Sequence, residues 1–252
     1  MVTAFEIETA MRQMADTEQQ RILSRFFKTG EGEYGAGDVF LGIKVPQTRA
    51  VVKEARLQVP LAEIETLLQS PYHEVRLCGF LLLVEEMNAA MPRRGIDSRE
   101  KALRRAEIAN FYIANARQAN NWDLVDLSCY KIVGQWLLHP QADGTMPGRD
   151  ILDTLARSDN LWEQRIAIVS TMMLIRDGQF DDTLRIATLL LGHPHDLIHK
   201  AIGWMLREIG KRDLASLAAY LDTHYSELHR TTLRYAIERL DPAERQAWLS
   251  RR

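Results

Sequence analysis

The sequence has few of the features that mark secreted, membrane-spanning or disulfide-rich proteins. It contains two cysteines, Cys78 and Cys129, and each lies in an apolar helical context. This predicts buried free thiols in a reducing compartment. The longest apolar runs, such as 79–84, are far shorter than a membrane span, and the Glu-rich beginning has no signal-peptide pattern. We therefore expect a cytoplasmic protein with no membrane partner.

A surplus of positive charge is also missing. Lys and Arg number 32, and Asp and Glu number 34, which gives a formal net charge of −2. This balance is not that of a generic nucleic-acid binder. A protein with this charge that binds DNA must concentrate its cations on one surface. The apolar fraction of 46% and the length of 252 residues allow a substantial core in one large domain or two small ones.

Strand patterns are absent as well. No segment sustains the alternation of apolar and polar residues that a half-buried strand requires, so we expect no sheet. Helical spacing and the positions of Pro, Gly, Asp and Asn predict an all-α chain instead. The expected helices cover residues 4–28, a segment opened by Pro46, 61–68, 74–91, 98–117, 121–138, 148–157, 161–176, 181–191, 196–211, 213–223, 230–239 and 242–250.

Similar helical units recur at intervals of about 35–45 residues, the range of helical repeats. Three of them begin with a turn, continue into a helix with an early basic residue and end in an apolar stretch, at 70–76, 158–165 and 193–200. HEAT-type repeats have this pattern, and together they curve into a concave surface. A non-repeating helical bundle is the alternative.

A glycine-rich loop at 29–38 interrupts the first helices. Its four glycines exclude regular helix there. A loop of this kind can bind phosphate, but it lacks the Gly-Lys-Ser/Thr ending of a P-loop, so phosphate binding is not favoured. The segment 39–43 that follows is short and apolar and is expected to be an extended connection.

The stretch 120–126 carries the most informative chemistry. Its two asparagines favour a helix start, since a short amide side chain accepts a bond from a free backbone N–H group. Trp122 and Asp126 are four residues apart and therefore share one face of the helix that follows. An indole beside a carboxylate suits a cationic or sugar-like ligand. A core tryptophan next to a solvated aspartate is the alternative.

Two further places carry residues that a repeat core does not require. Arg165 interrupts an apolar helix, and it either meets a ligand or pairs with Glu163 or another carboxylate. Trp204 follows Gly203, which is also compatible with ordinary close helix packing. The cations of 200–212 outnumber the one acidic residue of that segment by three, and they are Lys200, Arg207, Lys211 and Arg212. Equivalent helices of neighbouring repeats lie side by side, so these places are expected to converge.

These residues resemble the AlkD family, bacterial alkylpurine DNA glycosylases built from HEAT-like repeats. The resemblance runs in the same order through most of the chain. It rests on Phe40-Leu41-Gly42-Ile43 with Pro46 and Arg49, on Trp122-Asp123-x-Val125-Asp126, on Asn160-Leu161-Trp162-x-Gln164-Arg165-x-Ala167-Ile168, and on Lys200-Ala201-Ile202-Gly203-Trp204-x-Leu206-Arg207-Glu208.

The resemblance implies one domain over residues 1–252, a right-handed α-solenoid of HEAT-like (armadillo-type) repeats with a concave groove for duplex DNA. It implies that Asp126, Trp122 and Trp204 surround the sugar of the damaged nucleotide. Arg165 would contact the DNA backbone, and Lys200, Arg207 and Lys211 would add positive charge. Phe26 stands where the best-known form has an aromatic DNA contact with a hydroxyl, and the glycine-rich insertion after it is a second departure. Both departures affect the expected lesion preference.

The implied reaction is base excision repair of cationic N3- or N7-alkylated purines by hydrolysis of the N-glycosidic bond, without deep base flipping and without a metal or cofactor. A carboxylate near the sugar stabilises the oxocarbenium-like charge that forms as the base leaves. His193, His195 and His199 have loosely metal-like spacing, but a turn at Pro194 disfavours a metal site. We expect a monomer associated with the bacterial nucleoid. A non-catalytic helical-repeat module that binds DNA or a protein is the alternative.

Overall fold

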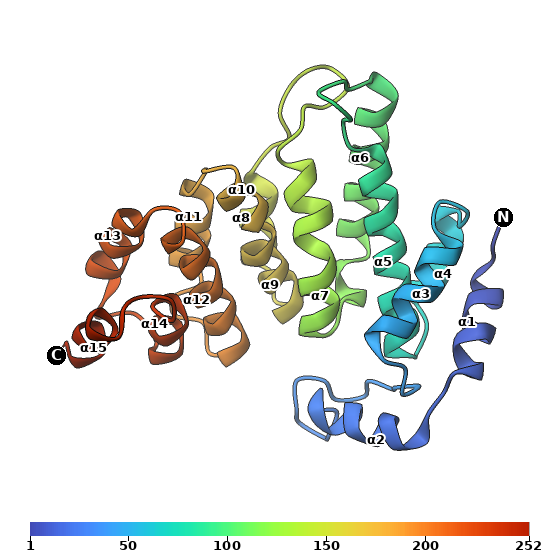
Figure 1. The fold of residues 1–252 in the computed structure, drawn as a ribbon, viewed down its shortest axis with the longest axis horizontal. Coiled ribbons are helices and arrows are strands. Elements are labelled where there is room, and N and C mark those ends of the chain that lie inside the picture. The colour runs from blue at the N-terminus through green and yellow to red at the C-terminus, as the bar shows by residue number, and fades with distance from the viewer. Residues whose placement is uncertain (252) are drawn as a thin grey trace. The chain divides into compact units, whose positions relative to one another are not determined.

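The computed structural model describes residues 1–251, and over this range the chain is helical with no β-strand (Figure 1). The only β-type pairings among these residues are two isolated bridges, Val39 with Tyr72 and Arg93 with Ile96. The prediction of an all-α protein is therefore confirmed. No helix within residues 1–251 has both the length and the apolar character needed to cross a membrane.

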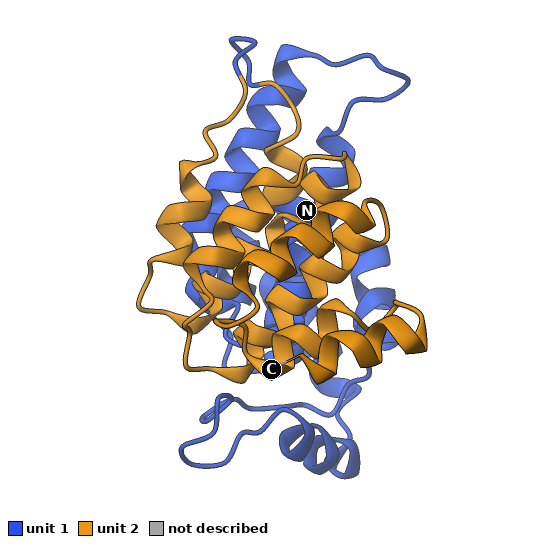
Figure 2. Cartoon of the chain, turned by 90° about the vertical axis from the view of Figure 1, so that its left-hand side faces the viewer, with its two compact units in different colours: residues 1–132, 141–145 blue, residues 133–140, 146–252 orange. Residues whose placement is uncertain are grey.

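The chain divides into two compact units (Figure 2). Unit 1 comprises residues 1–132 and 141–145, and unit 2 comprises residues 133–140 and 146–252. The helices of unit 1 are α1 (Ala4–Gln13), α2 (Thr17–Phe26), α3 (Val45–Ala55), α4 (Leu61–Leu68), α5 (His73–Ala90), α6 (Arg99–Ala114) and α7 (Trp122–Cys129), with a 3₁₀ turn at Ala116–Gln118.

Helix α5 is the central element of unit 1. It is buried along most of its length, from His73 to Val84, and it packs against α3, α4, α6 and α7. Apolar residues occur on every face of α5, as expected for a helix that neighbouring helices cover on every side. Gly79 allows the close approach of α4, since a Cβ there would lie 2.8 Å from a Leu68 methyl carbon. Unit 1 therefore packs α3, α4, α6 and α7 around one buried helix.

Unit 2 repeats a pattern of paired helices. Its elements are α8 (Asp150–Ala156), α9 (Leu161–Ser170), α10 (Met172–Arg176), α11 (Asp181–Leu189), α12 (Asp196–Gly210), α13 (Leu214–His224), α14 (Arg230–Ala236) and α15 (Pro242–Ser250). Helix α9 packs on α8 and α12, and α12 packs on α11, α13 and α14. Successive helices thus cover one another's apolar faces, as helical repeats do. The right-handed solenoid path, the concave groove and the single domain stay predictions.

Three expected helices are shorter or interrupted in the structure. The helix expected over 4–28 breaks at Asp16, whose carboxylate accepts a 2.9 Å bond from Gln19 N and caps α2. The helix expected over 121–138 changes to a π-helical segment at Tyr130–Gly134. The helix expected over 161–176 is split at Thr171, whose hydroxyl donates to the Ile168 carbonyl at 2.7 Å. Local side-chain bonds of this kind compete with regular helix.

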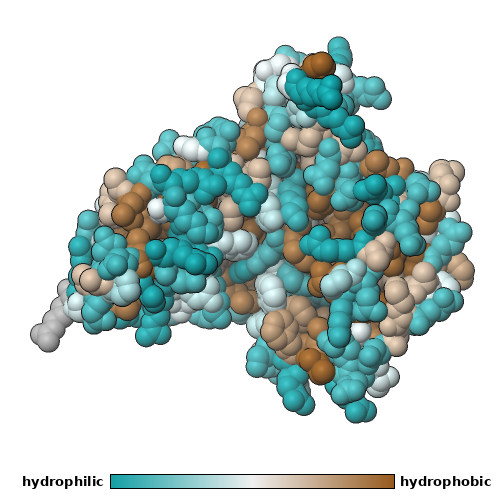
Figure 3. Space-filling model, viewed as in Figure 1, coloured by the Kyte–Doolittle hydropathy of each residue, from teal (hydrophilic) through white to brown (hydrophobic). Residues whose placement is uncertain are grey.

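Hydrophilic side chains cover much of the surface in Figure 3, with apolar side chains in scattered patches. The exposed apolar side chains include Phe26, which is 59% exposed, and this one is relevant to the site described next.

Candidate functional site

Trp122 and Asp126 lie near the start of α7, on the shared helix face that their spacing predicts. Asn121 caps the helix, and its side-chain oxygen accepts a 2.9 Å hydrogen bond from Trp122 N. Asn121 is fully buried, so the start of the helix is fixed. Trp122 and Asp126 are both half-buried and lie one turn apart on the same side of the helix. The structure therefore keeps both side chains accessible at the surface of unit 1.

An aromatic layer lies against Trp122. Phe27 stacks on the indole with ring centroids 5.3 Å apart, and Phe26 meets it edge-on at 6.0 Å. Phe40 also stacks on Phe27, with ring centroids 5.1 Å apart. The end of α2 thus supplies one buried and one exposed ring next to Trp122. The structure brings Phe26 and Trp122 together, although 96 sequence positions separate them, and Phe26 remains open to a ligand.

The segment 40–43 is a buried anchor, and the structure explains its sequence. The carboxylate of Glu74 accepts hydrogen bonds from three successive backbone N–H groups, Leu41 at 2.9 Å, Gly42 at 2.8 Å and Ile43 at 3.0 Å. Gly42 has φ +89°, and a Cβ there would lie 2.0 Å from the Asp16 carbonyl oxygen. The extended connection expected from sequence is therefore held in place between the start of α2 and the start of α5.

Below this layer lies a buried ionic network that sequence reasoning did not single out. His73 contacts Asp38 through Nδ1 at 2.7 Å and Asp123 through Nε2 at 2.9 Å. Arg76 donates to Asp38 and, at 3.0 Å, to the Asn120 side-chain oxygen. Burial would lower the pKa of His73, but the charges and hydrogen bonds of the two aspartates raise it to about 9. His73 is therefore an imidazolium at neutral pH.

The same network acts on Asp38. Burial would raise the pKa of this carboxyl, but the hydrogen bonds and charges of His73 and Arg76 hold the pKa below its ordinary value. The only sequence signal for the network was the turn at Ser70-Pro71-Tyr72 that introduces His73 and Arg76. Its members come from three distant segments, so no local pattern joins them.

Asp126 lies close to Tyr112 of α6. Burial raises the pKa of the Tyr112 hydroxyl well above its ordinary value, and the negative charge of Asp126 adds to this effect. Tyr112 contacts the Ser128 hydroxyl at 3.0 Å, and Ser128 in turn donates to the Leu124 carbonyl at 2.5 Å. These neutral contacts join α6 to α7 near Asp126. A half-buried carboxylate on a rigid helix is suited to stabilising positive charge.

Arg165, in unit 2, is buried. It is 5% exposed and donates through Nη1 to the Leu197 carbonyl at 2.6 Å, which joins α9 to the start of α12. The structure gives it a backbone acceptor across the α9–α12 contact. Its role as a DNA contact stays a prediction, and its structural role is an addition that the sequence did not show.

Trp204 is half-buried on α12, and its neighbour Gly203 explains part of the motif around it. A Cβ on Gly203 would lie 2.6 Å from the Thr232 carbonyl oxygen and 2.5 Å from the Tyr235 Cβ. The glycine is therefore required for close packing of α12 on α14. The close-packing interpretation holds for Gly203, and it leaves the indole of Trp204 partly accessible.

Two of the cations in 200–212 have carboxylate partners outside that segment, and a third pairs with Glu208 inside it. Lys200 pairs with Asp196 at 2.9 Å, one turn earlier on the helix. Arg207 pairs with Glu238, which follows α14, and Lys211 pairs with Glu208 at 2.5 Å. The expected local surplus of three positive charges is thus reduced by carboxylates outside the segment. Partly exposed pairs of this type are weak, so an incoming phosphate can compete for the cations.

No metal centre is formed by the described part of the chain. No three His, Cys, Asp or Glu side chains within residues 1–251 are placed to hold a metal ion. His193 instead contacts the Gln164 side chain at 2.8 Å, and His195 caps α12. His199 stacks on His229 with ring centroids 4.2 Å apart.

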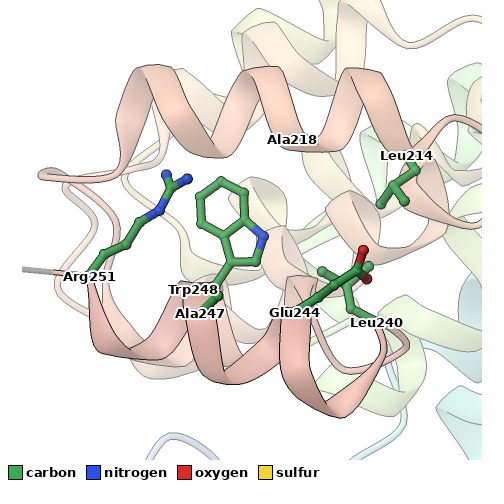
Figure 4. A pocket seen from close by; sticks show the side chains of 7 residues that line it. All are labelled: Leu214, Ala218, Leu240, Glu244, Ala247, Trp248 and Arg251. Carbon is green, nitrogen blue, oxygen red and sulfur yellow. The ribbon is translucent and has the colours of Figure 1, made fainter.

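Unit 2 also has a partly apolar pocket of about 230 Å³ between α13 and α15 (Figure 4). Arg251 lies over the Trp248 ring in this pocket, 3.8 Å from its centroid. None of the residues predicted for the site lines it, so it is separate from the chemistry considered above.

Comparisons with known proteins agree with the motifs. A family model described as DNA alkylation repair enzyme matches residues 7–240. Among solved structures, the chain is similar to a predicted DNA alkylation repair enzyme from Enterococcus faecalis, with 21% sequence identity and a TM-score of 0.63. That match covers 90% of this chain and 97% of the other. A search of curated proteins finds no match.

Proposed function

Because this chain belongs to the DNA alkylation repair enzyme family, we propose that it is a DNA glycosylase that excises cationic N3- and N7-alkylated purines from duplex DNA. The reaction is hydrolysis of the N-glycosidic bond, the first step of base excision repair. The protein would act as a monomer on the DNA of the bacterial cytoplasm. It would need no metal or cofactor, since the substrate itself is activated.

The chemistry of the substrate explains why a carboxylate and indoles suffice. Alkylation at N3 or N7 gives the purine a positive charge and weakens its bond to the sugar. Departure of the base leaves positive charge on the sugar, which a nearby carboxylate stabilises. Indole faces attract the same charge. Asp126 would stabilise the sugar and orient the attacking water, and Trp122 would contact the cationic nucleotide.

The observation that carries this proposal is the pairing of Trp122 and Asp126 on one accessible face at the start of α7. Both are half-buried, on a helix whose start is fixed by the buried cap Asn121. The exposed ring of Phe26 extends the aromatic surface beside Trp122. A rigid carboxylate one helical turn from an indole matches the charge that develops in the transition state. Trp204 is the third proposed contact with the nucleotide.

DNA affinity would come from cations whose present partners are few and partly exposed. Lys200, Arg207 and Lys211 would exchange their carboxylate partners for phosphates, and Arg165 would contact the backbone from α9. Such binding weakens with salt, because each neutralised phosphate releases counterions. This accounts for DNA binding by a chain whose net charge is −2.

The decisive experiment is single-turnover release of base from duplex DNA that contains alkylated purines. The wild type should release alkylated bases, and Asp126→Asn should slow release by about 10²-fold or more while duplex binding changes little. Asp222→Asn, an exposed position on α13, is the matched control and should be as active as the wild type. Binding of duplex DNA without release of any alkylated base would favour the non-catalytic module instead.

A further inference from the structure

The buried network under Trp122 joins three parts of unit 1. Asp38 ends the glycine-rich loop, His73 begins α5, and Asp123 lies in the first turn of α7, next to Trp122. All three side chains are at least nine-tenths buried. His73 contacts both carboxylates, at 2.7 and 2.9 Å. One imidazole ring thus connects the loop to the helix that carries the proposed catalytic residues.

Charge balance in this network depends on His73. Both ring nitrogens face carboxylate oxygens, which accept hydrogen bonds and cannot donate them when ionised. Both nitrogens must therefore carry protons, which makes the ring a cation. Two cations, His73 and Arg76, then face the two carboxylates of Asp38 and Asp123. A neutral ring would leave one buried carboxylate uncompensated, which is costly.

Asp123 relies on His73 in particular. Its Oδ2 contacts the imidazole, and its Oδ1 is buried without a hydrogen-bond partner within residues 1–251. Arg76 reaches Asp38 and Asn120 instead. A buried carboxylate with a single hydrogen-bond partner depends on that partner for its position, because losing the bond leaves it unsatisfied. His73 therefore helps to hold the first turn of α7 in place.

Ring contacts also connect His73 to the half-buried Trp122. His73 stacks on Phe40 with centroids 4.4 Å apart and also contacts Phe27 at 5.0 Å. Phe27 stacks on Trp122 at 5.3 Å. His73 therefore supports Trp122 in two ways, through the carboxylate of the adjacent residue and through the ring stack below the indole.

We propose that His73 is a positioning residue for base excision, a buried imidazolium clamp between Asp38 and Asp123 that fixes the orientation of Trp122 at the start of α7. This inference rests on the proposed function. It also gives the glycine-rich loop a role: the loop delivers Asp38 to the clamp. Gly35 permits this path, since a Cβ there would lie 2.4 Å from the Phe27 carbonyl oxygen.

The clamp itself is tested by NMR of protein labelled with ¹⁵N-histidine. One histidine should have both ring nitrogens protonated at pH 7 and should lose a proton only near pH 9. The charged groups around it are Asp38, Asp123, Arg76 and Glu74. This signal should be absent in His73→Gln and should titrate at lower pH in Asp38→Asn. A His73 ring with one unprotonated nitrogen at pH 7 would overturn the clamp.

Positioning is tested by the indole N–H signal of Trp122, assigned with Trp122→Phe. His73→Gln should shift this signal, whereas His224→Gln, a control on α13 in unit 2, should not. In single-turnover assays, His73→Gln should slow excision by about tenfold or more with less than about threefold change in duplex affinity. Asp38→Asn should do the same to a smaller extent, and it provides the answer if His73→Gln does not fold.

The outcomes separate this inference from the proposed function. If the Trp122 signal is unshifted in both His73→Gln and Asp38→Asn, the positioning role is overturned. This holds whether or not the wild type releases alkylated bases. The positioning role is also overturned if both variants excise alkylated bases at the wild-type rate. A wild type that releases no base overturns the proposed function alone. A shifted Trp122 signal in the variants still supports the clamp in that case.

Discussion

One oxygen of the Glu74 carboxylate accepts the backbone N–H of Gly42 at 2.8 Å, deep inside unit 1. The same oxygen accepts Ile43 N at 3.0 Å, and the other accepts Leu41 N at 2.9 Å. The carboxylate thereby satisfies three consecutive backbone donors that no regular element serves. The arrangement ties the segment after the glycine-rich loop to the start of α5, close to His73.

Replacement of Gly42 by alanine should destabilise the protein strongly. The substitution forces a side chain into a backbone with φ +89° and places its Cβ 2.0 Å from the Asp16 carbonyl oxygen. We expect a loss of about 3 kcal/mol or more in the free energy of unfolding by urea. Gly37→Ala is the control, because Gly37 has φ +83° but open space around it. It should lose only about 1 kcal/mol, and equal losses would show that the contact with Asp16 is unimportant.

Substrate choice should follow the charge of the damaged base. A site that supplies a carboxylate and indoles, with no evident general acid, favours leaving groups that are already cationic. We expect release of N3- and N7-alkylpurines and none of uracil or 1,N6-ethenoadenine in the same duplex context. The measurement is chromatographic quantification of free base after single-turnover incubation. Efficient release of a neutral base would contradict the carboxylate mechanism.

Trp204→Ala should slow excision while leaving the fold intact. The indole is half-buried, and its loss removes an attraction to positive charge worth about 1 kcal/mol, or about fivefold to tenfold in rate. Trp248→Ala, at the pocket of α15, is the matched control and should excise at the wild-type rate. Equal rates for Trp204→Ala and the wild type would remove Trp204 from the proposed site.

Lys200→Ala should weaken duplex binding and reduce its salt dependence. Each lost phosphate contact lowers the slope of log affinity against log salt by about 0.9. The pair with Asp196 is partly exposed, so the loss of fold stability should be small. Lys53→Ala, an exposed position on α3, should leave the slope unchanged. A slope for Lys200→Ala equal to that of the wild type would exclude a phosphate contact there.

Substitution of Arg165 should affect the stability of the fold as well as DNA affinity, because this residue also has a structural role. Its guanidinium is buried and donates to the Leu197 carbonyl at 2.6 Å. We expect Arg165→Ala to lower DNA affinity and, unlike Lys200→Ala, to reduce the unfolding free energy by about 1–3 kcal/mol. Urea denaturation and binding titration of the same preparation separate the two effects. Unchanged stability would mean that the bond to Leu197 contributes nothing.

His73 should make stability depend on pH on the alkaline side. Its pKa is raised from 6.5 to about 9 by the two aspartates, despite the opposing effect of burial. Its contribution is therefore complete below about pH 6.5, where the unfolded chain is also protonated, and is lost as the pH rises through about 9. The loss should amount to roughly 3 kcal/mol. Urea denaturation of the wild type and His73→Gln between pH 6 and 10 should show this difference, and parallel curves would contradict it.

Much of the fold could be predicted from local patterns. The expected helix at 61–68 matches α4, Ser98 caps α6, and Asn121 caps α7 as its amide chemistry indicates. These positions depend on residues close in sequence, whose effects are local. The break at Asp16 was missed because Asp and Thr are also compatible with a polar helix surface, and the Leu41–Asp16 backbone contact is non-local.

The site was predictable only in part for the same reason. Trp122 and Asp126 share a helix face by spacing alone, and the resemblance supplied Phe26 beside them. Two carboxylate partners of these cations lie outside the counted segment: Asp196 is one turn earlier than Lys200, and Glu238, the partner of Arg207, comes after α14. His73, 35 residues from Asp38 and 50 from Asp123, joins them only when the chain folds. Periodicity does not reveal such contacts.

Those separations also bear on the order in which unit 1 forms. Closing chain segments of 35 and 50 residues costs entropy before any contact is gained, and two buried carboxylates repel each other until the imidazolium lies between them. The helices can form from local contacts while the clamp is still open. On a ribosome, the aromatic layer would therefore stay loose until α7 has emerged. The surface proposed to meet the damaged nucleotide would be among the last parts of unit 1 to become rigid.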